Sequence, residues 1–569
     1  MTDRLSVGAT AAGPEGWAAA SRARGTVDAV LLAGAFFGAN LGKAAYFGAI
    51  IAGMSAPMMA YKLIFGAGVL FPLFFLLLRL RRWWPLYLFY TLQLAFMTAN
   101  LISFVNLDIH IKPVQYVVLF HEGLALIRYS AVPWSLELLV LLIDLPVLLW
   151  MVGKRRQIRT ALAESRVLRP LAIGTAVVMA ATLIALQFGG HSIAFLLSNP
   201  WSGESRLIKR YGVAASNVVD IARLARDRDI ESQFAYGPWI ESEGRDPRHG
   251  NILLVQVEGL GANAIAHEFE GLPIAPYLTE LAHGSVYYPY TLTYHAAGGT
   301  SDCEFSLINS VEALTSFPSM KLRNYRYPNS VARALADGGY GAFAFHGNYG
   351  SFFNRDVAFR QMGYSRFFDR LDMGLPEANW GAKDEEVFEF VLQTMQKQPS
   401  PFFFHVITMS SHEPFHYVRD YYSDPRFDAV ENSLVRDYFN SISYVDQAIG
   451  SFVNSALEID PLLRVVIVGD HTPFVIDEGY DIATCKIDGR RMEFVPLIIR
   501  VPGGRIARET ERVATMLDVG PTLLALSGLP FRIRSEGVDL LAGELPEGLV
   551  PFKGGRFSRG RLFAAVDGN

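Results

Sequence analysis

The chain has 569 residues, of which 51% are hydrophobic and 19% charged, and its formal net charge at pH 7 is −4. A charge this close to neutral gives no indication of a nucleic-acid partner, and the two cysteines, Cys303 and Cys485, are too few for a disulfide framework. Long apolar runs dominate the chain before about residue 190, whereas the rest alternates as a soluble α/β domain does. We therefore expect four parts: a transmembrane domain (1–189), a juxtamembrane linker (190–244), an α/β domain (245–545) and a C-terminal tail (546–569).

Five apolar stretches in the first part are long enough to span a membrane as helices. They cover about residues 27–50, 58–78, 84–105, 134–153 and 168–188. The first contains Asn40 and Lys43, and Lys43 either pairs within the helical bundle, snorkels to the interface or has a function of its own. The basic residues near these stretches form three clusters: Arg22 and Arg24; Arg79, Arg81 and Arg82; and Lys154, Arg155, Arg156 and Arg159. The positive-inside rule places these clusters in the cytoplasm, so five spans would put the C-terminal domain outside it.

Two connecting segments are less clearly marked. The loop at 106–133 mixes apolar and basic residues, which suits either an element in the lipid headgroup layer or a plain connector. In the linker, apolar residues recur at helical spacing from Val218 to Ala225 and predict a juxtamembrane helix.

Polar side chains follow three predicted strands of the C-terminal domain. Asn251–Gly259 is an apolar, β-branched run that ends in Glu258, and Arg464–His471 is a second such run that ends in Asp470 and His471. A third run, Pro401–Thr408, precedes His412. Open α/β sheets with a mainly parallel order build their sites at the carboxyl ends of their strands, so we expect these side chains to meet.

A hydroxyl follows two glycines in the run from His295 to Phe305, at Thr300, where a helix can begin. A helix N-terminus favours an alkoxide or a phosphate, so Thr300 is the candidate nucleophile of a phosphoryl transfer, with Ser301 as the alternative. The competing interpretation is a capped helix start, with Glu304 closing a capping box. Glu258, Asp470, His471 and Thr300 together form a mixed oxygen and nitrogen ligand set that suits Mn²⁺ or Zn²⁺.

These motifs resemble those of the alkaline-phosphatase-like sulfatase superfamily over residues 245–545, and the whole chain is similar to the lipoteichoic acid synthase and phosphoglycerol transferase family. In that family the motif Gly-Thr-Ser-Asp-x-Glu-Phe carries the nucleophile, and Thr300 occupies its place here. The resemblance assigns Glu258, Asp470 and His471 as metal ligands. It assigns substrate binding to His346, Phe353 and Arg355, whereas His412 is a candidate for catalysis and substrate binding from its place after a strand. Phe353 stands where many members have Trp.

The resemblance implies a multi-pass enzyme of the bacterial inner membrane with an extracytoplasmic catalytic domain. No ATP is available there, so the expected donor is a phospholipid, phosphatidylglycerol, and the expected acceptor is an envelope glycan or a growing polymer. The expected cofactor is a divalent metal, Mn²⁺, with Zn²⁺ or Mg²⁺ as alternatives. His412 would either protonate a leaving group or bind a phosphate oxygen. Arg355 would grip the phosphate through two nitrogens beside the donor His346, unless it forms a surface ion pair with Asp356.

Three other functions compete with phosphoglycerol transfer. A phosphoethanolamine transferase shares the threonine nucleophile, but those that modify lipid A usually carry several disulfides, which this chain cannot form. A sulfatase needs a Cys or Ser followed by x-Pro-x-Arg, whereas Glu-Phe-Ser-Leu follows Cys303. The non-enzymatic alternative is a membrane-anchored scaffold.

Overall fold

The computed structural model divides the chain into two compact units, which we describe separately. A helical unit comprises Met1–Ile111 and Val132–Arg223, and a second unit comprises Lys112–Ala131 and Leu224–Asn569. The structure describes residues 14–52, 56–107, 111, 113–119, 139–164, 168–187, 231, 234–244, 250–265, 267–296, 298–314, 317–322, 325–378, 380–473, 480, 484–487, 490–503, 508–509, 513–542, 549–552 and 555–558. Most of the loop at 106–133 and of the linker at 190–244, with its predicted helix, lies outside these residues.

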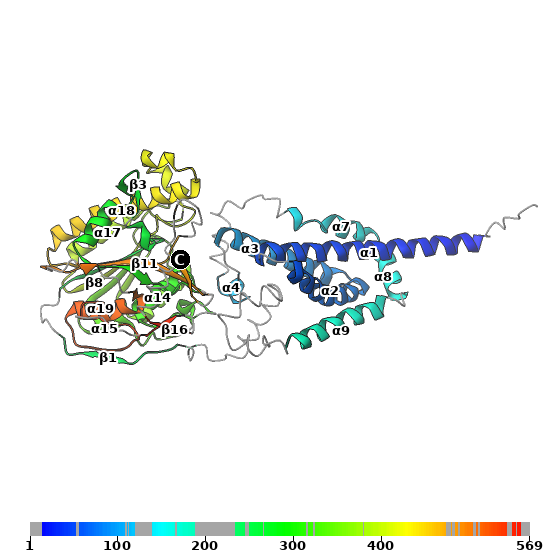
Figure 1. Cartoon of the computed structure of the whole chain (residues 1–569), viewed down its shortest axis with the longest axis horizontal. Helices are drawn as coiled ribbons and strands as arrows, with labels where there is room; N and C mark the ends of the chain where they lie inside the picture. The colour runs from blue at the N-terminus through cyan, green and yellow to red at the C-terminus, as the bar shows by residue number, and fades with distance from the viewer. Residues whose placement is uncertain are drawn as a thin grey trace, which may run out of the picture. The chain divides into compact units, whose positions relative to one another are not determined.

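The helical unit contains two helices long and apolar enough to cross a membrane, within Thr26–Ala49 and Trp84–Ile102. Its helices are α1 (Pro14–Ala52), α2 (Ala56–Arg79), α3 (Trp84–Leu107), α7 (Leu145–Gly153), α8 (Arg155–Glu164) and α9 (Leu168–Gln187) (Figure 1). Shorter apolar helical stretches lie at Gly66–Arg79 and Leu168–Ala181. Five spans therefore stay a prediction. In the fourth expected stretch, 134–153, the continuous helix among the described residues is α7, which begins only at Leu145.

A buried polar network joins α1 to α3 and to the turn before α7. Lys43 Nζ lies 2.7 Å from Asp144 Oδ2, and neither side chain is exposed. The Tyr90 hydroxyl donates to Asp144 Oδ1 at 2.7 Å, and Asn40 Nδ2 donates to Asp144 Oδ2 at 2.6 Å. Of the alternatives for Lys43, the structure selects pairing within the helical bundle.

The second unit is built on a mixed sheet with the strand order β12-β5-β11-β9-β2-β8-β6-β7. The strands are β2 (Ile252–Val257), β5 (Val286–Leu292), β6 (Gly341–His346), β7 (Arg366–Phe368), β8 (Phe402–Ile407), β9 (Arg464–Gly469), β10 (Thr484–Ile487), β11 (Arg490–Arg500), β12 (Arg508–Glu509) and β13 (Ala514–Thr515). The five strands from β9 to β7 are parallel, whereas β11 is antiparallel to both β9 and β5. The three strands predicted before Glu258, His412 and Asp470 are β2, β8 and β9.

Helices cover both faces of this sheet, so its central strands are apolar on both sides. α13 (Pro276–His283), α17 (Asp384–Lys397) and α18 (Ser433–Ile459) pack on one face. The other face carries α14 (Thr300–Asn309), α15 (Val331–Asp337), α16 (Arg355–Met362) and α19 (Met516–Ser527) (Figure 1). Alternate residues of β2 enter the two cores: Ile252 and Leu254 face one, and Leu253 and Val255 face the other.

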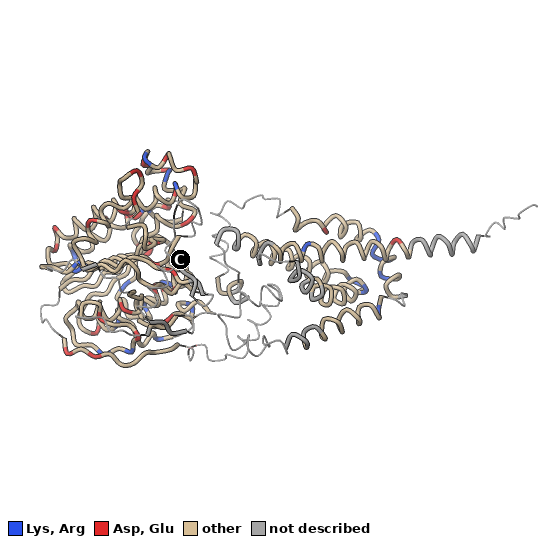
Figure 2. Tube along the Cα trace, in the orientation of Figure 1, with Lys and Arg blue, Asp and Glu red and all other residues tan. Residues whose placement is uncertain are grey.

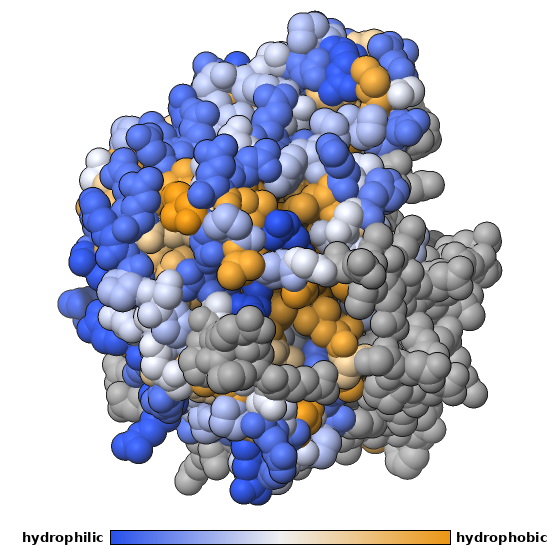
Figure 3. Space-filling model, turned by 90° about the vertical axis from the view of Figure 1, so that its left-hand side faces the viewer, coloured by the Kyte–Doolittle hydropathy of each residue, from blue (hydrophilic) through white to orange (hydrophobic). Residues whose placement is uncertain are grey.

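Shorter elements complete the second unit. They are α4 (Pro113–Val118) and three two-stranded sheets: β1 (Trp239–Ser242) with β14 (Phe531–Arg534), β3 (Glu268–Phe269) with β4 (Leu272–Pro273), and β15 (Leu549–Phe552) with β16 (Gly555–Ser558). Val550 and Phe552 are buried in the core although they lie beyond the boundary expected at 545. The unit's surface is mostly hydrophilic in the face shown in Figure 3.

His405 on β8 is a buried core residue whose ionisation makes stability depend on pH. Its Nε2 donates to Gln256 Oε1 at 3.3 Å and its Nδ1 accepts from the Tyr364 hydroxyl at 2.9 Å, so the ring is neutral. Burial lowers the pKa of His405 to about 3, whereas an unfolded histidine titrates near ~6.5. Between these values the unfolded chain binds the additional proton, so this stabilisation is complete above pH ~6.5 and is lost as the pH falls.

Below pH ~6.5, His405 makes the free energy of unfolding fall by up to about 1.4 kcal/mol for each pH unit. We expect His405→Gln to remove this contribution, so that the free energy of unfolding of the variant falls less steeply in acid. Thermal unfolding of the wild type and the variant between pH 4 and pH 7 measures this effect. Parallel pH profiles for the two proteins would contradict it.

Candidate active site

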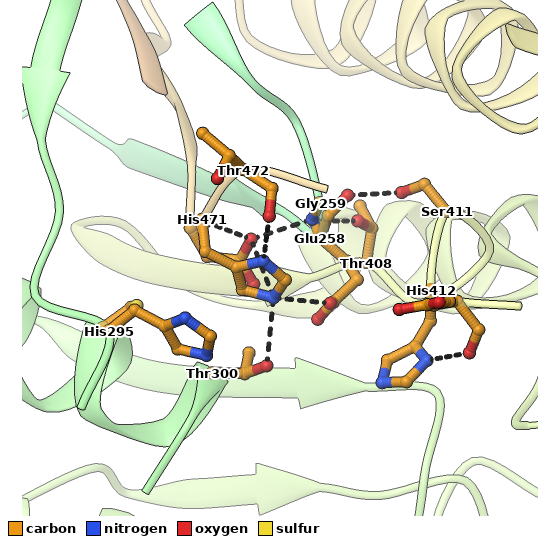
Figure 4. A network of polar contacts seen from close by, with 12 residues as sticks. Glu258, Gly259, His295, Thr300, Thr408, Ser411, His412, His471 and Thr472 are labelled. Atoms are coloured by element: carbon orange, nitrogen blue, oxygen red, sulfur yellow. Dashed lines mark hydrogen bonds and ion pairs between the residues drawn. The ribbon is translucent and has the colours of Figure 1, made fainter. Parts of the chain in front are cut away.

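Glu258 and Asp470 lie side by side because of the register between β2 and β9. Val257, the last residue of β2, pairs with Gly469, the last residue of β9, so the residue that follows each strand emerges at the same edge. The backbone N–H of Gly259 donates to Asp470 Oδ1 at 2.8 Å. Glu258 is 3% exposed and Asp470 is fully buried. Two carboxylates thus meet at the carboxyl end of the sheet, as the strand pattern predicts, and Figure 4 shows Glu258 there beside His471.

His471 lies between these carboxylates and Thr300. Its Nε2 is 2.9 Å from Glu258 Oε1 and 3.4 Å from Thr300 Oγ1. Its Nδ1 donates to the Thr472 carbonyl oxygen at 2.9 Å, which orients the ring with Nε2 toward Glu258 and Thr300. Burial alone would lower the pKa of His471, but Asp470 and Glu258 raise it well above its usual value. The cluster therefore favours a positive charge at this point.

The donor atoms of this cluster fit a divalent cation. Ligand atoms of Glu258, Asp470 and His471 all lie within 4.8 Å of one another. Asp470 Oδ2 is buried and has no hydrogen-bond partner among the described residues. Burial and the neighbouring charge of Glu258 raise the pKa of Asp470 well above its usual value, which is a cost that a bound cation would remove. Carboxylate oxygens with an imidazole nitrogen suit Mn²⁺ or Zn²⁺.

Thr300 is the first residue of α14, as predicted. Gly299 before it has φ +59°, a conformation that favours glycine. A Cβ on Gly298 would lie only 2.6 Å from Asp302 Oδ1, and Asp302 Oδ2 accepts from the Gly298 N–H at 2.6 Å. No side chain caps this helix start, so the capping-box interpretation is wrong. The Ser301 hydroxyl donates to the Gly298 carbonyl at 2.8 Å, which leaves Thr300 as the hydroxyl directed at His471.

Arg355, the first residue of α16, is held by Glu304 on α14. Its Nε donates to both carboxylate oxygens of Glu304, at 3.1 and 3.0 Å, and its Nη2 forms a further short contact with Oε1. The surface ion pair with Asp356 is wrong, because Arg355 is 2% exposed and pairs with Glu304. Because Nε and Nη2 both donate to Glu304, these two nitrogens cannot also bind a phosphate in this arrangement. Nη1 makes no hydrogen bond to a described protein group.

Phe353 lies against the loop that carries Thr300. A Cβ on Gly299 would be 3.8 Å from Phe353 Cζ, and the Arg355 guanidinium carbon lies 5.2 Å from the centre of the Phe353 ring. Phe353 and Asn354 both have positive φ, +54° and +63°, which is strained for non-glycine residues. Asn354 Nδ2 donates to the Met320 carbonyl at 3.0 Å and helps to hold this turn.

His346 is the last residue of β6, and His412 lies five residues after the end of the neighbouring strand β8; the Nδ1 of each ring donates to a backbone carbonyl. His346 Nδ1 donates to the Ile407 carbonyl at 3.2 Å, and burial, together with the charge of Arg355, lowers the pKa of His346 to about 3. His412 Nδ1 donates to the Glu413 carbonyl at 2.5 Å, and burial lowers its pKa as well. In these neutral tautomers Nε2 is an acceptor. His346 is therefore placed to accept from a hydroxyl, whereas we had expected it to donate to a phosphate.

Three further residues support the site and were not assigned from the sequence. The His295 ring stacks on His471 with centroids 4.7 Å apart and an interplanar angle of 11°, and its Nδ1 lies 3.6 Å from Glu493 Oε1 on β11. The Trp380 ring packs edge-on against His412 at 5.0 Å. His295 follows β5 by three residues at the same edge of the sheet, so the strand-end rule could have found it. Trp380 follows no strand and offered no such signal.

Comparisons with known proteins agree with this architecture. A family model described as Sulfatase matches residues 250–529. Lipoteichoic acid synthase 2 of Bacillus subtilis is 29% identical over 364 residues, which are 60% of this chain and 54% of that protein. The lipoteichoic acid synthase of Staphylococcus saprophyticus is 28% identical over 364 residues, 59% of this chain and 54% of that protein. The chain thus spans about half the length of these curated relatives.

One solved structure resembles both units. The integral membrane lipooligosaccharide phosphoethanolamine transferase A of Neisseria meningitidis has a TM-score of 0.57 and covers 90% of this chain and 96% of its own, at 15% identity. At this identity the likeness shows the fold alone. Residues 250–529 therefore form a domain of the sulfatase family, in a chain that resembles the lipoteichoic acid synthases.

Proposed function

We propose that this protein transfers phosphoglycerol from a phospholipid, phosphatidylglycerol, to an exported glycan or glycerol-phosphate acceptor. The observation that carries the proposal is the position of Thr300 Oγ1, at the start of α14 and 3.4 Å from His471 Nε2 in the cluster that fits a cation. The curated relatives are named lipoteichoic acid synthases, which supports glycerol phosphate chemistry over other reactions of the superfamily.

Glu258, Asp470, His471 and Thr300 would hold the divalent cation, for which we propose Mn²⁺, with Zn²⁺ or Mg²⁺ as alternatives. When bound, the cation stabilises phosphoryl charge and lowers the pKa of the Thr300 hydroxyl. The N-terminus of α14 adds backbone N–H groups that favour negative charge beside Thr300.

The reaction has two substitutions. Thr300, as an alkoxide, attacks phosphorus, the bond from phosphorus to the diacylglycerol oxygen breaks, and a phosphoglycerol–threonine intermediate forms. His412, neutral in the free site and protonated at Nε2 in the donor complex, gives this proton to the leaving diacylglycerol oxygen. The acceptor hydroxyl then gives its proton to His412 and attacks phosphorus, and Thr300 leaves as the alkoxide. The proton count balances over one cycle, and the lowered pKa of His412 favours the first transfer.

The remaining predicted residues would bind the phosphoglycerol group. Phe353 provides an apolar wall beside the nucleophile loop, and Arg355 offers Nη1 to a phosphate oxygen while Glu304 holds the other nitrogens. His346 Nε2 would accept from a glycerol hydroxyl, since its Nδ1 proton is used by Ile407. In this proposal Arg355 binds the negatively charged phosphate of the substrate, and His346 binds a hydroxyl of its glycerol.

A membrane location completes the proposal. We propose that residues 1–189 cross the bacterial inner membrane five times, that residues 190–244 form the linker and that residues 245–545 act outside the cytoplasm. Large apolar side chains on the helices are exposed, among them Leu31 at 65%, Leu76 at 61% and Val177 at 60%, as expected for contact with lipid. The catalytic domain would then work beside its lipid donor.

The test measures diacylglycerol release from phosphatidylglycerol by the purified full-length protein with Mn²⁺. We expect release that a chelator abolishes and that added Mn²⁺ restores. Phosphatidylethanolamine, presented in the same bilayer, is the matched control lipid. Release from phosphatidylethanolamine alone would replace the proposal with phosphoethanolamine transfer, and no release from either lipid would favour the scaffold.

A further inference from the structure

A cavity of about 460 Å³ lies in the helical unit, far along the chain from the catalytic residues. Four arginines and two apolar residues line it: Leu80, Arg81, Trp83, Arg155, Arg156 and Arg159. Arg81 comes from the turn between α2 and α3, and the other three arginines come from the first half of α8. Figure 2 shows Lys and Arg gathered at this turn and at α8. Two separate elements thus direct guanidinium groups into one space.

The local structure fixes this arrangement through the buried sides of both elements. On α8, Ile158, Ala161 and Leu162 are buried in the core of the helical unit, which leaves the arginines of the helix on its outer side. At the turn, Trp83 is 3% exposed, and its Nε1 donates to the Leu78 carbonyl at 3.1 Å. The turn and the helix therefore cannot separate freely to relieve the repulsion among their arginines.

Among the side chains that the structure describes, the four arginines have no counter-charge. Within the described residues, none of Arg81, Arg155, Arg156 and Arg159 forms a salt bridge with a carboxylate. Holding like charges around one cavity costs free energy, which an anion in the cavity would offset. A planar guanidinium matches the geometry of phosphate oxygens through paired N–H donors, so several of them around one cavity suit a phosphate group.

Exposed tryptophans near the cavity indicate its depth relative to the membrane. Trp84, next to the lining residue Trp83, is 61% exposed, and Trp150, near the end of α7, is 62% exposed. Lys154 Nζ lies 5.3 Å from the centre of the Trp150 ring. Tryptophan and lysine side chains with this exposure are typical of the interfacial layer of a membrane, where lipid phosphates reside.

We propose that this cavity is a binding site for a phosphate-bearing anion in the interfacial layer of the membrane. The phosphate group belongs either to an anionic lipid headgroup or to a soluble phosphate ester. The positive-inside rule places the same arginines on the cytoplasmic side, so the site would sense ligands in a different compartment from the reaction. The site is independent of the proposed phosphoglycerol transfer, because its residues belong to the helical unit.

The test is calorimetric binding to the full-length protein in neutral detergent, without turnover. The probes are dioctanoyl phosphatidic acid and glycerol 3-phosphate, which present the same phosphate with and without acyl chains. The variant Arg155→Gln with Arg159→Gln removes two charges from the cavity, and Arg82→Gln with Lys154→Gln removes two charges from the same end but outside it. We expect the first variant to weaken binding at least about tenfold and the second by less than about twofold.

Binding of the lipid alone would assign the site to a headgroup, and equal binding of both probes would assign it to a soluble phosphate ester. Equal affinity of the wild type and the cavity variant, or equal losses in both variants, would overturn the proposal in favour of diffuse attraction. Arg155→Lys with Arg159→Lys keeps the charge and removes the planar forks, and we expect it to bind with intermediate affinity.

Discussion

Replacing Thr300 by alanine is expected to reduce the rate of diacylglycerol release by at least about 10³-fold while the fold remains intact. The reason is that Thr300 supplies both the attacking oxygen and one ligand of the proposed metal site. Its hydroxyl makes a single described hydrogen-bond contact, the 3.4 Å contact with His471, so its loss removes little structural support. Initial rates with saturating phosphatidylglycerol, together with the melting temperature of each protein, measure the two effects separately.

Ser301 provides the matched control, because it carries the same hydroxyl at the next position and lacks only the methyl group of threonine. Ser301→Ala removes the hydrogen bond to the Gly298 carbonyl and should cost about 1 kcal/mol of stability with less than a tenfold loss of rate. Mass spectrometry of the protein during turnover should detect the phosphoglycerol adduct on Thr300. An active Thr300→Ala with an inactive Ser301→Ala would reverse the assignment of the nucleophile.

The meeting of Glu258, Asp470 and His471 could be predicted from the sequence because these residues obey one rule of sheet geometry. β2 and β9 are parallel neighbours, and their last residues pair, so whatever follows both strands must meet. The glycine pair before Thr300 likewise predicts a helix start, since Gly299 adopts a positive φ that other residues rarely take. These signals are local, and each can be read within a segment of ten residues.

The interactions that the sequence did not reveal join distant segments without a shared rule. Glu304 and Arg355 are 51 positions apart, and each has a plausible local partner or role. Lys43 and Asp144 meet across the helical unit, where helix packing selects one partner among several. The proton positions of His346 and His412 depend on which backbone carbonyl each Nδ1 meets, and residue types do not contain that information.

The second large effect is expected at Glu304, whose replacement by alanine should destabilise the second unit by about 3–5 kcal/mol. Glu304 is fully buried and Arg355 is 2% exposed, so loss of the carboxylate leaves a buried guanidinium without a counter-charge. An exposed pair offers the matched control: Glu241 and Arg532 lie 2.8 Å apart with both side chains 61% exposed. Glu241→Ala should cost less than about 1 kcal/mol.

Unfolding of each variant by denaturant, followed for the second unit, measures the two costs. A similar cost for Glu304→Ala and Glu241→Ala would show that the Arg355 charge reaches solvent or another partner when Glu304 is absent. The rate of diacylglycerol release should also fall in Glu304→Ala, because Glu304 lies one helical turn after Thr300 and ties α14 to α16.

A double replacement separates structural support from a role in binding phosphate. Glu304→Leu with Arg355→Met replaces the buried pair by apolar side chains of similar length, which should restore most of the lost stability because no uncompensated charge remains. If the role of Arg355 is structural only, the double variant should also recover its rate of diacylglycerol release. If Nη1 of Arg355 holds the phosphoglycerol group, the rate should stay low despite the recovered stability, and KM for phosphatidylglycerol should rise. We expect the second pattern, because Glu304 uses Nε and Nη2 and leaves one nitrogen, beside Phe353 and the Thr300 loop, for the substrate.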